Sequence, residues 1–172
     1  MHVKNRAPAS THKRVVVLLL DHTVVKGYLN PASLGHADAI ELLTQEGEHR
    51  SIAAEEVKSV YFVREFEADF QLERKTFLSR PKLEGLWVRL RFRDEDVMEG
   101  IVSSDLLDLL NSGVQLTPPD VHSNTLHLFV PSTALLEMKV LGVVGVGRRG
   151  RRMTADASAA TALAAQAKLF GE

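Results

Sequence analysis

Apolar positions along the chain gather in short runs, and the same succession of runs occurs twice. An apolar run at 15–20 ends at an aspartate, resumes after two polar residues and reaches a glycine, and the run at 88–92 opens the same succession 73 positions later. The aligned positions are Asp21 with Asp94, the apolar pairs 24–25 with 97–98, and Gly27 with Gly100. Apolar runs interrupted by a polar turn predict β-hairpins. The sequence therefore predicts two copies of one small β-unit.

The correspondence extends through the rest of each copy. Segment 40–42 aligns with 114–116, and it is followed by Ile52 with Val130, Val57 with Leu135, Val60 with Met138, and Phe62 with Val140. One extra residue in the first loop and four more in the second keep the copies in register, and these insertions lie among turn residues. We expect an all-β protein of two tandem five-stranded barrels, Sm-like or SH3-like, with a packed connecting segment and mobile tails.

Four residues are predicted to have structural roles within these units. Gly27 and Gly100 lie inside the second strand of each copy, where a lone glycine marks a bend at which a side chain would clash. Asp21 and Asp94 stand where the first hairpin turns, a position that aspartate favours. In the second copy, arginines alternate with apolar residues over 87–93, which predicts a strand with one solvated face.

The same patterns suggest domain boundaries. We expect a mobile leader at 1–12, the first barrel at 13–63, a connecting segment at 64–84, the second barrel at 85–141, and a basic hinge with an alanine-rich helical tail at 142–172. The connecting segment carries three phenylalanines, which favours packing against the barrels over the alternative of a flexible linker.

Composition narrows the class of protein. Apolar residues make up 45% and charged residues 25%, as in soluble globular proteins. The chain has no cysteine, which excludes disulfides and thiolate metal sites, and its longest apolar run is too short to cross a membrane. Residues 15–147 carry twelve basic and twenty acidic residues, a net charge of −8, whereas the two ends are basic. We predict a cytoplasmic protein without integral membrane contact, in which any affinity for phosphates would reside in the tails or in a local patch.

Candidate chemistry is sparse. The seven histidines are scattered, no phosphate-binding glycine loop or nucleophile elbow is present, and we expect no catalytic residues, no metal and no cofactor. The best candidate for phosphate or nucleic-acid binding is the cluster of Arg148, Arg149, Arg151 and Arg152, with a solvated tail as the alternative. A following amphipathic helix would place Leu163, Ala167 and Phe170 on one side, to dock on a partner or on the barrels.

Three resemblances accompany these patterns. The strand, turn aspartate, apolar pair and glycine of each copy are similar to the first motif of Sm-like RNA-binding barrels, although that family's base-binding aspartate and asparagine and its second motif are not matched. The span 13–141 resembles an uncharacterised family of bacterial proteins found alongside signalling domains, which implies a bacterial cytosolic origin. Arg148 and Arg152 have the Arg-x-x-x-Arg spacing of PilZ domains, which bind cyclic di-GMP, but here the pair follows the barrels.

These observations together favour a binding protein over an enzyme. We expect a non-enzymatic protein-interaction or regulatory adaptor that uses exposed strand edges and the C-terminal tail, with another protein as its partner and a homo-oligomer through strand edges as a further arrangement. The alternative is a protein that binds RNA, DNA or a cyclic dinucleotide through its basic C-terminal segment.

Overall fold

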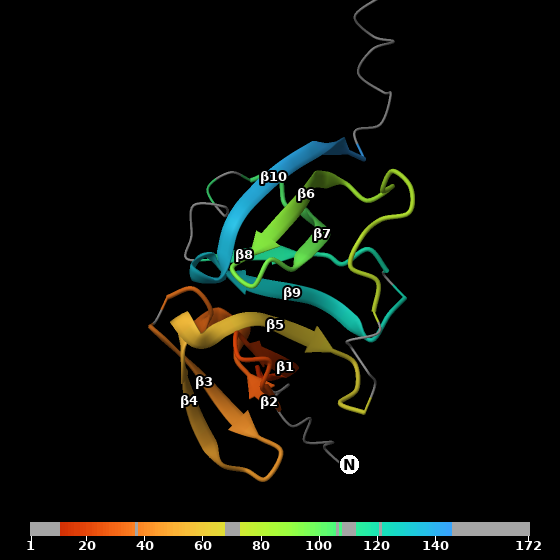
Figure 1. Cartoon of the computed structure of the whole chain (residues 1–172). Helices are drawn as coiled ribbons and strands as arrows, with labels where there is room; N and C mark the ends of the chain where they lie inside the picture. Colours follow the sequence, from red (N-terminus) through yellow and green to blue (C-terminus); the bar gives the residue numbers. More distant parts are fainter. Residues whose placement is uncertain are drawn as a thin grey trace, which may run out of the picture.

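The computed structural model describes residues 11–36, 38–67, 73–105, 107, 113–120 and 122–145, which form ten β-strands joined by turns and short 3₁₀ segments (Figure 1). The strands are β1 (Lys13–Leu19), β2 (Val24–Leu29), β3 (Ala39–Thr44), β4 (His49–Ala53), β5 (Val57–Val63), β6 (Gly85–Phe92), β7 (Val97–Val102), β8 (Gly113–Leu116), β9 (Thr125–Pro131) and β10 (Leu135–Val144). The 3₁₀ segments are η1 (Pro31–Ser33), η2 (Ala54–Glu56) and η4 (Ser132–Ala134). The predicted all-β class is confirmed.

The strands form two antiparallel sheets. One has the order β4-β3-β2-β1-β5-β9-β8, and the other has the order β10-β6-β7. Ile101 in β7 and Thr117, just after β8, exchange backbone hydrogen bonds of 3.0 and 2.8 Å, so the two sheets meet at one bridge.

The two sheets are open, which differs from the expectation of two closed barrels. The reason is the pairing of β5. Its outer edge is taken by β9, a strand from the second half of the chain, through pairs such as Val60 with Phe129. Within the described residues, β4 has no strand on its outer edge. The fifth strand of the first predicted barrel therefore pairs with the fourth strand of the second, and neither barrel closes on itself.

Strands β1 to β5, here called the first unit, and strands β6 to β10, the second unit, share one pairing pattern. In each unit the first strand pairs with the second and the fifth, and the third pairs with the fourth. Val15 lies opposite Phe62 in the first unit, and Val88 lies opposite Val140 in the second. The ladder between first and fifth strands even shifts register near the same point, at Leu18/Leu19 in one unit and at 135/137 in the other.

Strand β1 is buried on both faces, which explains its unbroken apolar run. Val15 and Val17 point into a core made of first-unit residues and Phe129 of β9, while Val16 and Leu18 point into a core shared more widely with the second unit. Its counterpart β6 buries only one face. The buried side chains of β6 alternate with the exposed Arg89 and Arg91, as the arginine alternation predicts.

At both glycines of the repeated pattern the backbone lies close to a neighbouring strand. A Cβ on Gly27 would overlap the carbonyl oxygen of Leu43, and a Cβ on Gly100 would overlap the Leu116 side chain and lie 3.0 Å from the Thr117 carbonyl oxygen. Neither glycine has a positive φ, so close approach and not unusual backbone conformation is what requires glycine there.

The described part of the connecting segment packs against both units, and the Phe66 ring meets the Tyr28 ring of β2 edge-on at a centroid distance of 5.5 Å. Phe66 is buried in the shared core, and Phe77 meets the Trp87 ring edge-on with centroids 6.0 Å apart. The carbonyl of Lys75 accepts a 2.7 Å hydrogen bond from the Glu99 N–H.

The end of the second unit differs from the predicted boundary. Strand β10 continues beyond 141 to Val144, which lies opposite Gly85. Residues 142–144, expected to begin a basic hinge, are thus ladder residues, because the start of β6 provides them with a strand to pair with.

Candidate functional site

The first hairpin of each unit turns in the same way around its aspartate. The Thr23 N–H donates to Asp21 Oδ1 at 2.8 Å, and the Asp96 N–H donates to Asp94 Oδ1 at 3.2 Å. The residues between them, His22 and Glu95, have φ values of 69° and 65°. The Thr23 hydrogen bond lowers the pKa of Asp21. The two aspartates therefore shape turns, the structural role that the sequence predicts for them.

A buried lysine ties the first unit to the turn of the second. Lys58 in β5 is almost fully buried, and its Nζ lies 2.5 Å from Asp94 Oδ2 and 3.0 Å from Asp96 Oδ2. Lys75 Nζ adds a 2.7 Å contact to Asp96 Oδ2. Burial is the largest single effect and raises the pKa of both carboxyls, but the hydrogen bonds they accept and the nearby lysine charges together outweigh it and hold each pKa below its usual range. The four charges thus neutralise one another across the junction.

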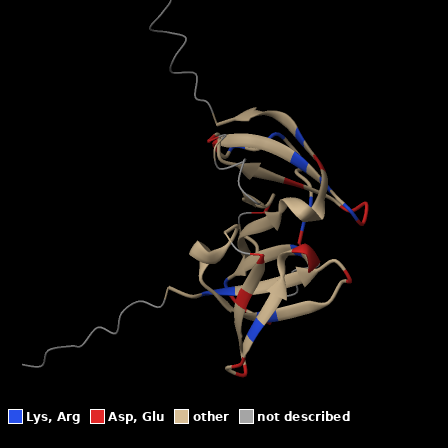
Figure 2. Cartoon of the chain, turned by 90° about the vertical axis from the view of Figure 1, so that its left-hand side faces the viewer, with Lys and Arg blue, Asp and Glu red and all other residues tan. Residues whose placement is uncertain are grey.

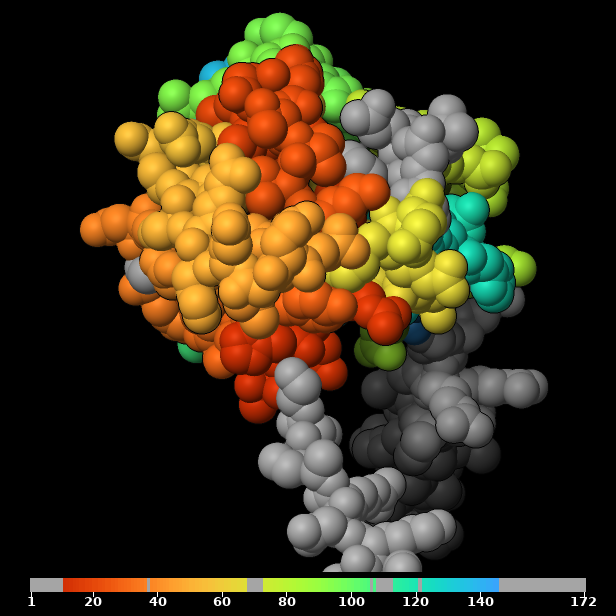
Figure 3. Space-filling view, turned by 90° about the horizontal axis from the view of Figure 1, so that it is seen from below, coloured from red at the N-terminus to blue at the C-terminus, as the bar shows by residue number. Residues whose placement is uncertain are grey.

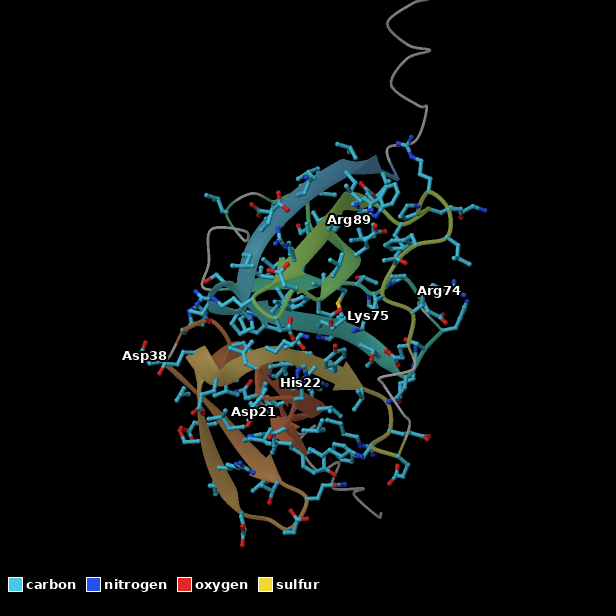
Figure 4. All side chains as sticks on the ribbon, viewed as in Figure 1. Asp21, His22, Asp38, Arg74, Lys75 and Arg89 are labelled. Atoms are coloured by element: carbon cyan, nitrogen blue, oxygen red, sulfur yellow. The ribbon has the colours of Figure 1, made fainter. Side chains whose placement is uncertain are left out.

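A pocket of about 640 Å³ opens between the units beside this network. Its lining includes His22, Tyr61, Arg74, Lys75 and Pro118, of which Figure 4 labels three. Burial raises the pKa of Tyr61 to about 12, so its phenol stays protonated at neutral pH. The lysines and aspartates at the pocket wall are paired with one another. Because paired groups are less free to exchange protons, this wall is better suited to joining the two units than to acid-base chemistry.

Glu99 forms a second charged cluster, on β7. Its side chain is buried and accepts from Arg89 Nε and Nη2 at 3.0 and 2.7 Å, from Trp87 Nε1 at 3.2 Å and from the Phe77 N–H at 3.1 Å. Burial raises the pKa of Glu99, and these four donors more than offset that effect, so the pKa is lowered. The cluster fastens the connecting segment to the second unit. No group of three or more potential ligands for a metal occurs among the described residues.

The outer edge of β10 is the most distinctive surface of the described chain. Strand β10, drawn in blue in Figure 1, runs along one side of the three-stranded sheet. Leu136, Val140 and Val143 are each more than half exposed, and Met138 is 37% exposed. We call the stretch Leu136–Val140 the β10 edge. Its alternating apolar residues enclose one acidic and one basic residue, Glu137 and Lys139, whose charged atoms lie 3.5 Å apart.

The counterpart of β10 in the first unit shows what covers such an edge. Every residue of β5 is buried, its side chains pack into the two cores, and β9 pairs with its residues Val60 to Val63. Phe62 lies opposite His127, with the two rings stacked at a centroid distance of 4.2 Å. In contrast, β10 is the last strand of its sheet, and no described strand lies on its outer side.

Charge does not gather at any single described surface. Figure 2 shows basic and acidic residues interspersed over both units, with acidic residues at the loop tips. Seen from below, in Figure 3, the first unit presents mainly its β3 and β4 side (orange).

The described residues include no helix long and apolar enough to cross a membrane.

Sequence reasoning and structure select different candidates. The predicted phosphate-binding residues Arg148, Arg149, Arg151 and Arg152, and the docking residues Leu163, Ala167 and Phe170, lie outside the described residues. Sequence reasoning named strand edges in general as docking sites but missed β10 in particular. The sequence signal is limited to Glu137 and Lys139, which stand where the buried Ser59 and Tyr61 lie in the first unit.

Comparison with known proteins identifies a family but no function. The sequence model of DUF6982, described as a family of unknown function, matches residues 11–142. No curated protein and no solved structure matches the chain.

Proposed function

The chain belongs to DUF6982, a family of unknown function, and we propose that it is a non-enzymatic protein-interaction or regulatory adaptor. In this proposal the two units are copies of one five-stranded module of the Sm-like or SH3-like kind. The shared pairing pattern supports duplication, because the first-to-fifth strand ladder has the same register in both units. The β5 to β9 pairing then serves to join the copies into one rigid scaffold.

The observation that carries the proposal is the exposed β10 edge. An unpaired strand edge offers a row of backbone donors and acceptors to any extended segment that lies beside it. Soluble proteins usually blunt such edges with charges or bulges, and this edge carries one charged pair, yet it also exposes Leu136, Met138 and Val140. Those apolar side chains would contribute binding energy once a partner strand covers them.

The charged clusters support binding over catalysis. Lys58 and Lys75 are committed to Asp94 and Asp96, and Glu99 is committed to Arg89. A general acid or base needs a group that is within reach of a substrate and free to exchange a proton. The interior charges of this protein instead stabilise the junction between units and the path of the connecting segment.

The proposal is tested by placing a photo-crosslinking amino acid at Met138 in the native host, with the same amino acid at Leu78 as a control. Leu78 is 80% exposed and lies outside the strands. We expect protein adducts from position 138 and none of the same mass from position 78. Equal adduct patterns from the two positions would reject β10 as a docking edge.

The alternative function is binding of nucleic acid or a cyclic dinucleotide through the basic C-terminal segment. Purified protein would be titrated with single-stranded RNA, duplex DNA and cyclic di-GMP, alongside a variant carrying Arg148→Ala, Arg149→Ala, Arg151→Ala and Arg152→Ala. We expect no salt-dependent binding by either protein. Tight binding at physiological salt that is lost in the variant would establish the alternative in place of the adaptor.

A further inference from the structure

We propose that the β10 edge binds the β10 edge of a second copy of this chain, which forms a two-fold symmetric dimer with one continuous six-stranded sheet. The inference rests on the proposed function, because it names the occupant of the same edge. A two-fold interface must be self-complementary, since each residue meets the partner's copy of the residue opposite it. The sequence of the edge satisfies that condition.

The self-complementarity is centred on Met138. When two copies of the edge run antiparallel with Met138 opposite Met138 of the second copy, Glu137 lies opposite the second copy's Lys139, and Lys139 opposite its Glu137. Leu136, which sits at the register shift of the ladder to β6, would lie beside Val140 of the second copy. The dimer thus gains two cross-strand pairs of opposite charge and an apolar cluster from the side chains that are now exposed.

Charge selects this register over its neighbours. A slip that places Lys139 opposite Lys139, or Glu137 opposite Glu137, sets like charges against each other, which destabilises paired strands. A slip by one residue sets Met138 opposite a charge and moves every side chain to the other face. The ladder to β6 also shifts register on either side of residues 137–140, so the regular part of the edge coincides with the charged pair.

The outer edge of β4 in a second copy fits the β10 edge less well than a second β10 edge does. If a second copy lay on β10 as β9 lies on β5, the shared pairing pattern would set Arg50 of β4 opposite Lys139, which are like charges. Strand β4 also presents three exposed polar residues, His49, Arg50 and Ser51, to the apolar side chains of β10. The symmetric β10 pair avoids both penalties.

The expected dimer is weak and reversible. Five residues from each strand bury less surface than the roughly 1,600 Å² of a standard stable interface. In analytical ultracentrifugation, the apparent mass of the full-length chain should therefore rise from that of a monomer toward that of a dimer as the protein concentration increases.

Single charge reversals provide the decisive test. Glu137→Lys sets lysine opposite lysine twice in the dimer, and Lys139→Glu sets glutamate opposite glutamate twice. Each variant on its own should weaken dimerisation by about tenfold or more. An equimolar mixture of the two should form a heterodimer with affinity near that of the natural chain, because each lysine then meets a glutamate. Repulsion within each strand persists in the mixture, so this recovery can come only from contacts between copies.

Controls separate the interface from the fold and from other occupants. Leu78→Lys, at an exposed apolar residue off the edge, should leave the dimer intact, and thermal melting should show that all variants remain folded. Arg50→Glu on β4 should also have no effect. A monomer at every concentration would overturn the proposal, and so would an assembly that β4 substitution disrupts or one in which the mixed variants fail to associate.

The failure of this inference and of the proposed function are distinguishable. If the chain stays monomeric but the photo-crosslinker at Met138 captures a different protein, the edge is a docking site and only its occupant has been misassigned. If position 138 gives no specific adduct and the chain stays monomeric, the docking role of β10 fails as well.

Discussion

Strands β5 and β10 hold the same place in their units, yet one is completely buried and the other is largely exposed. The ladder between β5 and β1 has the same register as the ladder between β10 and β6, so pairing within each unit does not distinguish the two strands. The difference comes from the next strand. Strand β9 covers β5, and no described strand covers β10. The edge of β5 is therefore completed by a strand of the neighbouring unit, whereas no strand among the described residues completes the edge of β10.

The neighbouring strands carry the same contrast. The face of β1 that holds Val16 and Leu18 packs on the second unit, whereas the matching face of β6 carries Arg89 and Arg91. Burial of that face in the first unit accounts for the continuous apolar run of β1, because a strand covered on both faces needs no polar alternation. Contact between units, more than the fold of each unit, explains where their sequences diverge.

The largest test of this comparison introduces the same charge into both strands. Val60 in β5 is fully buried, and its aligned counterpart is the partly exposed Met138. Val60→Asp should lower the free energy of unfolding by about 4 kcal/mol or more, because an unpaired carboxylate enters the core. Met138→Asp should cost about 1 kcal/mol at most. Chemical denaturation measures both changes in the free energy of unfolding. Equal decreases in the two variants would contradict the claim that β5 is covered and β10 is exposed.

A second test removes the buried ion pairs at the junction. Lys58→Ala leaves Asp94 and Asp96 without their buried partner and should cost about 3 kcal/mol, near the lower end for such a break because the carboxylates keep 20% and 28% exposure. The aligned Leu136→Ala should cost far less, since Leu136 is more than half exposed.

The pH dependence of stability provides an independent check on the same pairs. The lowered pKa of Asp94 and of Asp96 means that their contribution is present above about pH 4 and is lost as pH falls through the folded pKa values. Denaturation at several pH values should show that Lys58→Ala loses part of this acid dependence. An unchanged acid limb in the variant would show that the lysine does not set those pKa values.

A third test addresses the bends that both units share. Gly27→Ala should destabilise by more than about 1 kcal/mol, because its Cβ would overlap the Leu43 carbonyl oxygen, and Gly100→Ala should do the same against Leu116. Gly142→Ala is the matched control, since a Cβ there meets nothing within 4 Å. If thermal melting showed the same stability for all three variants, close approach at Gly27 and Gly100 would not be what requires glycine there.

The smallest effect concerns the cover of β5. Burial lowers the pKa of His127, which stacks on Phe62, so the folded protein favours the neutral ring. Stability should therefore decrease as pH falls from about 6.5 through the lower folded pKa, because the unfolded chain takes up the proton first. His127→Gln should abolish this decrease, whereas His49→Gln, at the exposed counterpart in β4, should leave it unchanged.

Much of the strand pattern could be predicted from the sequence because the same succession of apolar runs and turns occurs twice. The alignment of Phe62 with Val140 places both residues at the same ladder position, and the glycine and aspartate pairs mark the same bends and turns. The joining of the units through β5 and β9 could not be predicted, since hydrophobic patterns show that a strand is covered but not by which strand. The same limit hid the β10 edge, whose exposed apolar residues resemble core residues until the pairing is known.

Amide hydrogen exchange of the full-length chain at high and at low protein concentration tests the central claim most directly, that β10 is an unfinished edge which a second copy completes. We expect amides within Leu136–Val140 to gain protection at the higher concentration, while those of β4 and of the permanently covered β5 exchange at the same rate in both samples. Exchange from the β10 edge that is independent of concentration, or a gain in protection on β4 instead, would contradict the account.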